Sequence, residues 1–275
     1  MTVQRLTDRF AALKAQDRAA FVAYVMAGDP DKETAFQILS GLPGAGADII
    51  EVGFPFSDPM AEGPPIQKAA QRALAAGTTL DDVLALVARF RQGDQATPII
   101  LMGYMNIVVT RGETGFARDC AAAGVDGLII VDCPPEEADP LADALDAEDI
   151  ALIRLATPTS DEKRLPTVIR RTKGFVYYVS VAGVTGVKEA NAAAVAPSVE
   201  RIRKASGLPV AVGFGIRTPE RAAEVARVAD GVVVGSALVE AVAEAIAQNR
   251  EAPSKVLETA ASLAQAVKSA RVRSA

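Results

Sequence analysis

Eight short apolar runs alternate along the chain with alanine-rich stretches that have the spacing of amphipathic helices. The runs are almost continuously apolar and rich in Val and Ile, which is typical of parallel strands buried on both faces. They span residues 21–28, 48–54, 98–104, 127–132, 151–157, 175–181, 209–215 and 231–237. Two helical stretches end in GAD (46–48) and GVD (124–126), a pattern that indicates a helix C-cap leading into a strand.

Alternation of eight strands with helices predicts an α/β fold, a (β/α)8 TIM barrel formed by one domain over residues 1–275. A doubly wound open sheet is the alternative, but it usually has fewer strands and a GxGxxG turn after the first, which this sequence lacks. We expect an extra helix before the first strand (3–16) and a closing helix at 254–270. The long intervals after the second and sixth runs predict extended loops at the strand ends where barrel active sites lie.

Composition narrows the chemistry. The chain has 29 Lys and Arg, 34 Asp and Glu, a net charge of −5, and neither His nor Trp. Without histidine a Ser-His-Asp triad and imidazole zinc ligation are excluded, so proton transfer near neutral pH falls to carboxylates, Lys, Tyr or Cys. The mild acidity argues against a nucleic-acid partner.

Neither a signal peptide nor a membrane span is indicated. The N-terminal residues are charged and amphipathic, and no apolar run approaches the roughly 18 residues that a span requires. The two cysteines, Cys120 and Cys133, do not make a disulfide framework and are interpreted as reduced, buried thiols. We therefore expect a cytoplasmic protein.

Glu51 interrupts an otherwise apolar strand, DIIEVGF. A buried carboxylate is costly unless it is paired or functional. Strand alternation places it on the same face as Ile49 and Gly53. If that face points inward, Glu51 lies near the top of the barrel lumen, and desolvation raises its pKa as a general acid requires. The alternative is a salt-bridged glutamate at a strand end.

A loop rich in Pro and Gly (54–65) follows this strand and carries Asp58 and Glu62. It is either a solvated turn or an active-site loop that brings a second carboxylate to Glu51. In the sixth run, Tyr177 shares a face with Phe175 and Val179. With Tyr24, Tyr104 and Phe214 it suggests a pocket for a flat apolar group, although routine core packing explains each aromatic residue equally well.

Glycines near the last two strands suggest a phosphate site. TIM barrels often bind phosphate with the loops after strands seven and eight. Gly213 and Gly215 follow the seventh run, and Gly235 and Ser236 begin a helix after the eighth. Their backbone N–H groups can approach an anion closely, although glycines also serve tight turns. A GVTG segment at 183–186 is a candidate lid over a ligand.

Five strings in this sequence carry a resemblance to the tryptophan synthase alpha subunit family, and the similarity extends in order over nearly the whole chain. They are AYVMAGDP (23–30), ADIIEVGFPFSDPMAEGPPIQKA (47–69), VAGVTG (181–186), GFGI (213–216) and VGSALV (234–239). The resemblance implies a TIM barrel that cleaves indole-3-glycerol phosphate to indole and glyceraldehyde 3-phosphate. This is a retro-aldol reaction that needs neither a metal nor an organic cofactor.

The resemblance also implies roles for individual residues. Glu51 is the catalytic glutamate that moves protons at indole C3 and at the glycerol hydroxyl, Glu62 is the second carboxylate, on the indole N–H, and Tyr177 is the active-site tyrosine. The substrate-binding positions are Tyr24, Tyr104 and Phe214 around the indole, and Asp132 and Thr185 between the carboxylate loop and the lid. The phosphate-binding positions are Gly186, Gly215, Gly235 and Ser236.

Two positions depart from the family pattern. Where relatives usually read ADGP, this chain has Glu62 in place of the aspartate, which keeps the charge and adds a methylene group. Val181 stands where many relatives carry an arginine before the lid. We interpret both as variants of an active enzyme.

The resemblance further implies a partner. A tryptophan synthase beta subunit, in an alpha2-beta2 heterotetramer, receives the indole for L-tryptophan synthesis and holds pyridoxal phosphate. This chain has no lysine in its eight apolar runs to form a Schiff base. The segments 54–65 and 104–110, expected as loops, resemble the partner-binding surface. Three alternatives stay open: a stand-alone lyase, an idle binding subunit, and another phosphate-binding barrel such as a sugar-phosphate epimerase or indole-glycerol phosphate synthase.

Overall fold

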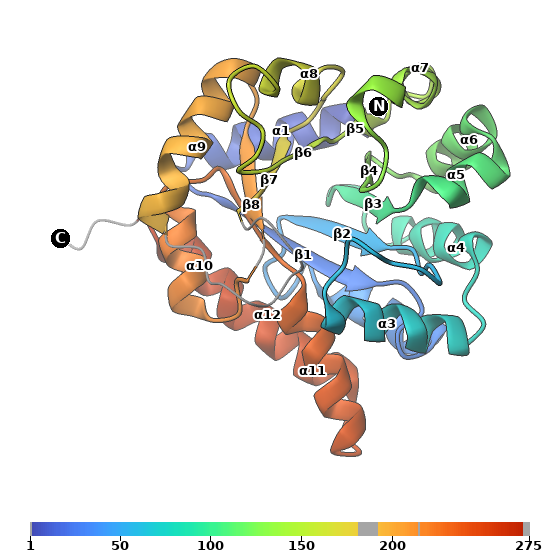
Figure 1. The fold of residues 1–275 in the computed structure, drawn as a ribbon. Helices are drawn as coiled ribbons and strands as arrows, with labels where there is room; N and C mark the ends of the chain where they lie inside the picture. The colour runs from blue at the N-terminus through green and yellow to red at the C-terminus, as the bar shows by residue number, and fades with distance from the viewer. Residues whose placement is uncertain (1, 181–191, 214, 272–275) are drawn as a thin grey trace.

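The computed structural model describes residues 2–180, 192–213 and 215–271. Its parallel strands form one sheet in the order β5-β4-β3-β2-β1-β9-β8-β7-β6, curled into a barrel (Figure 1). The strands are β1 (Ala20–Met26), β2 (Ile49–Gly53), β3 (Ile99–Gly103), β4 (Gly127–Ile130), β5 (Ala151–Leu152), β6 (Leu155–Ala156), β7 (Val176–Val179), β8 (Val210–Gly213) and β9 (Gly231–Val234). Each coincides with a predicted apolar run, and the TIM-barrel prediction is confirmed.

The fifth run, 151–157, closes the barrel although it divides into β5 and β6. The two strands that end the sheet order are separated only by Ile153 and Arg154. The Ile153 N–H donates to the Leu128 carbonyl on β4 (2.9 Å), and the Tyr177 N–H of β7 donates to the Arg154 carbonyl (3.0 Å). This short run therefore bonds to both of its neighbours and completes the ring.

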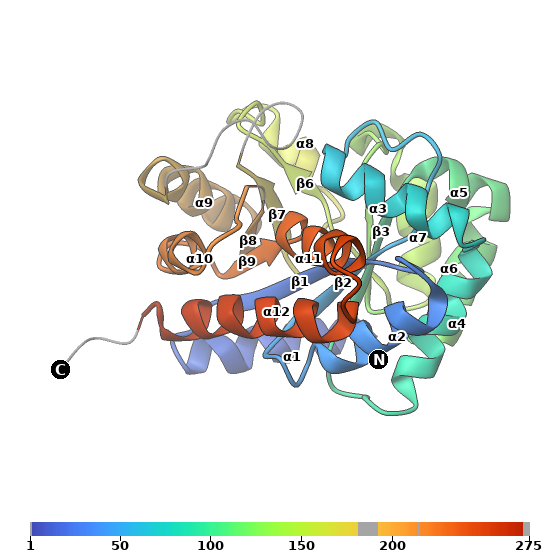
Figure 2. The same ribbon diagram turned by 90° about the horizontal axis from the view of Figure 1, so that it is seen from below.

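Helices surround the strands (Figure 1). Their bounds are α1 (Thr2–Ala15), α2 (Lys32–Gly41), α3 (Pro64–Ala75), α4 (Leu80–Arg91), α5 (Met105–Arg111), α6 (Glu113–Ala123), η1 (Pro135–Glu137), α7 (Asp139–Ala147), α8 (Leu165–Ile169), α9 (Ala192–Ser206), α10 (Pro219–Ala226), α11 (Ser236–Ala247) and α12 (Ala252–Ser269). The predicted closing helix is α12, which packs against α10, α11 and β1 (Figure 2). Within the described ranges, no helix has the length and apolarity needed to cross a membrane.

The extra N-terminal helix, α1, plugs the N-terminal end of the barrel. Its residues Leu6, Phe10 and Leu13 are buried in the same cluster as the inward-facing side chains of the strands. The Phe10 ring lies 5.5 Å from that of Phe175, which precedes β7. Substrate therefore has access to the lumen from the opposite, C-terminal end.

Strand alternation divides the core into two clusters. The inner one contains Ile49, Phe175 and Tyr177, whereas Ile50 and Tyr178 belong to the outer one, between strands and helices. The predicted inward faces of the second and sixth runs are therefore correct. This register directs the Glu51 side chain into the lumen.

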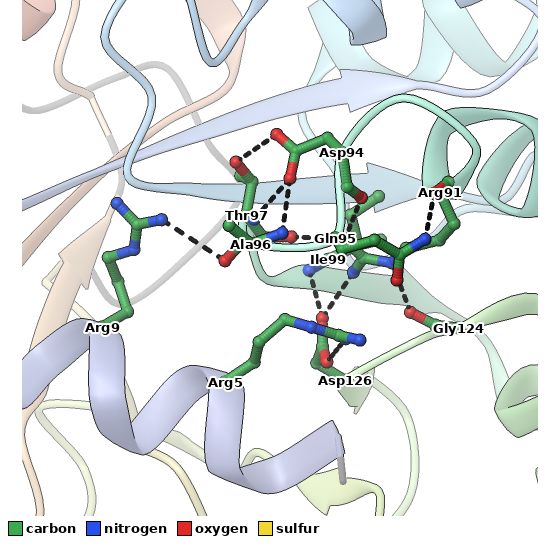
Figure 3. A network of polar contacts seen from close by, with 10 residues as sticks. All are labelled: Arg5, Arg9, Arg91, Asp94, Gln95, Ala96, Thr97, Ile99, Gly124 and Asp126. Carbon is green, nitrogen blue, oxygen red and sulfur yellow. Dashed lines mark hydrogen bonds and ion pairs between the residues drawn. The ribbon is translucent and has the colours of Figure 1, made fainter.

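Aspartates at strand entrances tie the N-terminal end of the barrel together. Asp126, fully buried before β4, accepts hydrogen bonds from the Ile99 N–H at the start of β3 (2.7 Å) and from Arg91 (2.6 Å), and it also pairs with Arg5 (Figure 3). Asp48 and Asp230 repeat the arrangement, accepting from the N–H groups of Phe21 and Val210 and pairing with Arg18 and Arg203. The aspartates of the GAD and GVD patterns thus join neighbouring strands.

Two segments predicted as loops are partly helical, so these expectations were wrong in detail. Residues 105–111 form α5, whose first N–H, at Met105, donates to the Asp132 carboxylate from the next βα loop (2.8 Å). Pro64 and Pro65 open α3, because proline is preorganised for the first helical turn and has no N–H to leave unbonded there. The loop after β2 is consequently shorter, ending at Gly63.

Candidate active site

A cavity at the C-terminal mouth of the barrel gathers most of the predicted site residues. Strands β1, β2 and β7, the loop after β2 and the segments after β8 and β9 each contribute to its wall. The predicted residues that line it are Tyr24, Glu51, Glu62, Tyr177, Gly215, Gly235 and Ser236. Four apolar residues that sequence analysis missed complete the wall: Ile66, Met102, Ile216 and Val233.

Glu51 is 1 % exposed and points from the middle of β2 into this cavity. Its Oε2 atom is buried without a hydrogen-bond partner, and the described residues offer it no ion pair, so the salt-bridged alternative is wrong. Burial, and secondarily the nearby charge of Glu62, raises the pKa of Glu51 to about 8. The raised pKa keeps the carboxyl group protonated at neutral pH, and no described residue forms a hydrogen bond with its Oε2 atom.

Glu62 lies in the loop after β2, and its side chain is buried rather than solvated. The loop backbone fixes it, because its N–H donates to the Pro59 carbonyl (3.0 Å) and its carbonyl accepts from Gln67 Nε2 (2.9 Å). Burial raises its pKa to about 7. Asp58, the other acid of the loop, is exposed and bonded to Ser57, so Glu62 supplies the second carboxylate of the cavity.

Tyr24 and Tyr177 fill the lumen beside the two carboxyl groups. Each hydroxyl lies over a glycine of a neighbouring strand: a Cβ added to Gly53 would come within 2.2 Å of Tyr24 Oη, and one added to Gly213 within 2.2 Å of Tyr177 Oη. Burial raises the pKa of both hydroxyls well above the ordinary value, so they stay neutral donors. Gly213 therefore makes room for a tyrosine and does not line the cavity.

Tyr104 and Asp132 are not among the lining residues. The Tyr104 hydroxyl accepts the Ala61 N–H (3.1 Å), and its ring stacks on Phe56 at 5.0 Å. Tyr104 thus supports the loop that carries Glu62, and Asp132 holds the first turn of α5. Thr185, Gly186, Phe214 and Val181 lie outside the described residues.

The segments that follow β8 and β9 give the cavity wall a part that suits an anion. Gly215 has a φ of +75°, which favours glycine. Gly235 precedes Ser236, the first residue of the 12-residue helix α11. The first-turn N–H groups of a helix have no acceptors within it and carry a partial positive charge. An anionic group can therefore bind in the same cavity as the two carboxyl groups. The described residues contain no group of three or more Cys, Asp or Glu side chains suited to a metal ion.

A closed parallel barrel with two buried acids and the N-terminus of a helix around one cavity at its mouth has the features of a TIM-barrel enzyme that uses acid–base chemistry. The sequence model of the family "Tryptophan synthase alpha chain" matches residues 10–268. The chain is 72 % identical to the tryptophan synthase alpha chain of Phenylobacterium zucineum over 271 residues, 98 % of both chains, and 69 % identical to that of Caulobacter vibrioides over 272 residues, 99 % of both.

Solved structures agree with this assignment. The tryptophan synthase subunit alpha of Legionella pneumophila superposes with a TM-score of 0.89 at 40 % identity, covering 96 % of this chain and 98 % of the other. Tryptophan synthase of Mycobacterium tuberculosis superposes with a TM-score of 0.86 at 37 % identity, with the same coverage. The chain belongs to the tryptophan synthase alpha chain family and is a lyase.

Proposed function

We propose that this chain cleaves indole-3-glycerol phosphate to indole and glyceraldehyde 3-phosphate with Glu51 as the proton donor. The observation that carries the proposal is the pair of buried carboxyl groups, with pKa values of about 8 for Glu51 and about 7 for Glu62, around one cavity. Two acids whose environments separate their pKa values divide the roles of acid and base. Near neutral pH, Glu62 ionises first while Glu51 keeps its proton.

The reaction needs a proton delivered and a proton removed. Glu51 protonates indole C3 and forms an indolenine, which carries positive charge at the ring nitrogen. The resulting Glu51 carboxylate then accepts the proton of the glycerol hydroxyl as that carbon becomes an aldehyde. The electron pair of the broken C–C bond returns to the ring, so indole leaves neutral and Glu51 regains its proton.

Glu62 stabilises the charged intermediate in this scheme. As a carboxylate it accepts a hydrogen bond from the indole N–H when positive charge develops there. Buried charge complementarity of this kind is worth more than in water because the site has a low dielectric constant. The hydrogen bonds of the Glu62 backbone hold the longer side chain in the cavity wall.

The remaining lining residues bind the two ends of the substrate. The phosphate lies at Gly215, Gly235 and Ser236, and Gly186 joins them by family resemblance. The flat indole contacts Tyr24, with Met102 and Ile66 as apolar walls. Tyr177 lines the same cavity as Glu51, and its neutral hydroxyl is a hydrogen-bond donor for the reacting part of the substrate.

We further propose that the chain works in an alpha2-beta2 complex with a tryptophan synthase beta subunit, which consumes the indole and holds pyridoxal phosphate. The chain itself needs no cofactor for the proposed steps. Two large apolar side chains are exposed on segments that flank the mouth, Met60 at 72 % and Val109 at 57 %. Both cysteines are buried free thiols, in keeping with a reducing compartment such as the cytoplasm.

An indole-release assay on the purified chain, with and without a beta subunit, tests this function. We expect slow indole release alone and faster release with the partner. Fast release without the partner would indicate a stand-alone lyase. An idle binding subunit would release none in either case, and the proposal would then be wrong.

A further inference from the structure

Asp29 and Arg72 form a buried ion pair that the proposed mechanism does not use. Asp29 follows β1 and its side chain is 2 % exposed, whereas Arg72 lies on α3 with a side chain 25 % exposed. The guanidinium group donates twice, from Nε to Oδ1 (2.6 Å) and from Nη2 to Oδ2 (2.7 Å). Such a bidentate pair fixes orientation as well as distance. Neither residue lines the cavity that contains Glu51 and Glu62.

The ion pair holds α3, the helix that begins directly after the loop of Glu62. Gly63 is the N-cap of α3, and Ile66, in its first turn, lines the cavity. The buried face of the helix consists of one isoleucine and three alanines: Ile66, Ala69, Ala70 and Ala73. Alanine methyl groups allow close packing but form shallow ridges, so they do little to fix a helix along its own axis. The pair formed by Arg72, in the last turn, supplies that constraint.

The segment after β1 contacts the end of α3 at a second point. Gly28, with a φ of +74°, lies against Thr78, and a Cβ added to this glycine would come within 2.0 Å of Thr78 Oγ1. Thr78 is buried, and its hydroxyl has no hydrogen-bond partner, so this contact depends on shape. Two neighbouring residues, Gly28 and Asp29, therefore connect α3 to β1, the strand that carries Tyr24 into the cavity wall.

Arg72 also lies beside α11, the helix whose start belongs to the part of the wall that suits an anion. Its Nη2 atom is 3.5 Å from the carbonyl of Val239, a buried residue close to the start of α11. Val239 belongs to the same inner cluster as Tyr24 and Ile66. The elements α3, β1 and α11 pack against one another, with the two helices side by side (Figure 1). Arg72 is thus placed where the helix after Glu62 meets the helix that begins at Ser236.

We propose that Asp29 and Arg72 are positioning residues for the cleavage reaction, and that their ion pair sets the position of Glu62 relative to the start of α11. The inference rests on the proposed function, in which one substrate molecule presents its indole N–H to Glu62 and its phosphate to α11 at the same time. Neither residue touches the substrate. A shift of α3 by about 1 Å would misplace Glu62 and Ile66 together, and an error of that size can lower a rate by about 100-fold.

Steady-state kinetics of indole release by the full chain carrying Arg72→Gln test the proposal. We expect kcat per folded molecule to fall at least about tenfold, while KM and the inhibition constant of inorganic phosphate change less than about threefold. Phosphate alone contacts only the anion-binding segments and does not need α3 in place. Arg72→Lys keeps the charge without the planar fork, so its kcat should lie between those of the wild type and Arg72→Gln. Unchanged kcat in Arg72→Gln, or an equal loss of phosphate affinity, would overturn the proposal.

Two further variants separate positioning from stability, with urea unfolding as the measure of the folded fraction. Asp29→Asn combined with Arg72→Gln leaves no buried charge unpaired, so it tests the same loss of kcat if the single variant folds poorly. Arg18→Gln is the matched control, because Arg18 pairs with the buried Asp48 at the other end of the barrel, with side chains 20 % and 8 % exposed. It should lower stability and leave kcat per folded molecule unchanged.

The outcomes for this inference and for the proposed function differ. Equal losses of kcat in Arg18→Gln and Arg72→Gln would assign the effect to stability and refute the positioning role. An active wild type whose kcat survives in the double variant would refute this inference alone. A wild type that releases no indole, with or without a beta subunit, would overturn the proposed function and this inference with it.

Discussion

Glu51 and Glu62 face one cavity from a strand and from the loop that follows it, and the charge of Glu62 opposes ionisation of the more deeply buried Glu51. The charge of Glu62 therefore helps to keep the pKa of Glu51 above that of Glu62. In the proposed mechanism the active form has one proton on this pair. That proton resides on Glu51, the residue with the higher pKa.

The pH profile of kcat/KM for indole release should be bell-shaped, with its maximum between about 7 and 8. Below that range Glu62 gains a proton and loses its affinity for the indole N–H, and above it Glu51 loses the proton that C3 requires. Rate measurements from pH 5 to 10 in buffers of constant ionic strength will check this. A profile that is flat across this range would contradict the assignment of both groups.

Glu51→Gln should lower kcat for cleavage by at least about 100-fold, because an amide cannot deliver or accept the proton. The same variant should be more stable than the wild type at pH 8. The folded pKa of Glu51, about 8, exceeds the ordinary value of 4.5, so its contribution to stability is complete below pH 4.5 and declines as the pH rises to 8.

Urea unfolding of both proteins at pH 5 and pH 8 separates these effects. The difference in the free energy of unfolding, Gln variant minus wild type, should be larger at pH 8 than at pH 5. We expect an increase of at least about 1.4 kcal/mol, the equivalent of one pKa unit. The Glu62 carboxyl is present in both proteins and acts as an internal control. Retained cleavage by a folded Glu51→Gln protein would exclude Glu51 as the proton donor.

Substitutions at Glu62 should separate the effect of its charge on activity from the effect of its side-chain length. Glu62→Gln removes the charge and should lower kcat/KM by about 100-fold, the scale of a lost electrostatic contact to the transition state. Glu62→Asp keeps the charge but shortens the side chain by one methylene group, which moves the carboxylate away from the indole N–H. Its kcat/KM should therefore lie between those of the wild type and Glu62→Gln. Steady-state kinetics of the three proteins decide the matter, and Gln activity equal to that of the wild type would rule out the N–H acceptor role.

The inward placement of Glu51 and Tyr177 was predictable because strand alternation is local and strictly periodic. The fifth apolar run was also correctly found. Its division at Ile153 and Arg154 was not predictable, because that break depends on the two different strands that the run must bond.

Contacts between distant loops were harder to anticipate. Tyr104 reaches Ala61 and Asp132 reaches Met105, so both support neighbouring segments rather than line the cavity. No local pattern encodes such pairings, since they depend on how the βα loops pack above the barrel. The apolar lining residue Ile66 was missed because it follows the segment 54–65, and only the packing of α3 over the barrel mouth brings it to the cavity.

Met60→Asp should weaken binding of a beta subunit by at least about tenfold, because a charge replaces an apolar side chain in the proposed interface. Indole release by the isolated chain should not change, since Met60 does not line the cavity. Ile246→Asp, at an exposed apolar position near the end of α11, is the control and should bind the partner normally. Equal affinities of the Met60 variant and the wild type would remove this loop from the interface.

Asp126→Ala should destabilise the fold by about 3–5 kcal/mol without changing activity per folded molecule. The substitution leaves the buried Arg91 without its carboxylate, and the Ile99 N–H without its acceptor, at the end of the barrel remote from the cavity (Figure 3). Asp126→Asn keeps one acceptor oxygen and should lose less. Urea unfolding measures the difference, with Asp8→Ala, at an exposed position of α1, as the control. A loss confined to activity would mean that this network communicates with the site and does not simply hold the strands together.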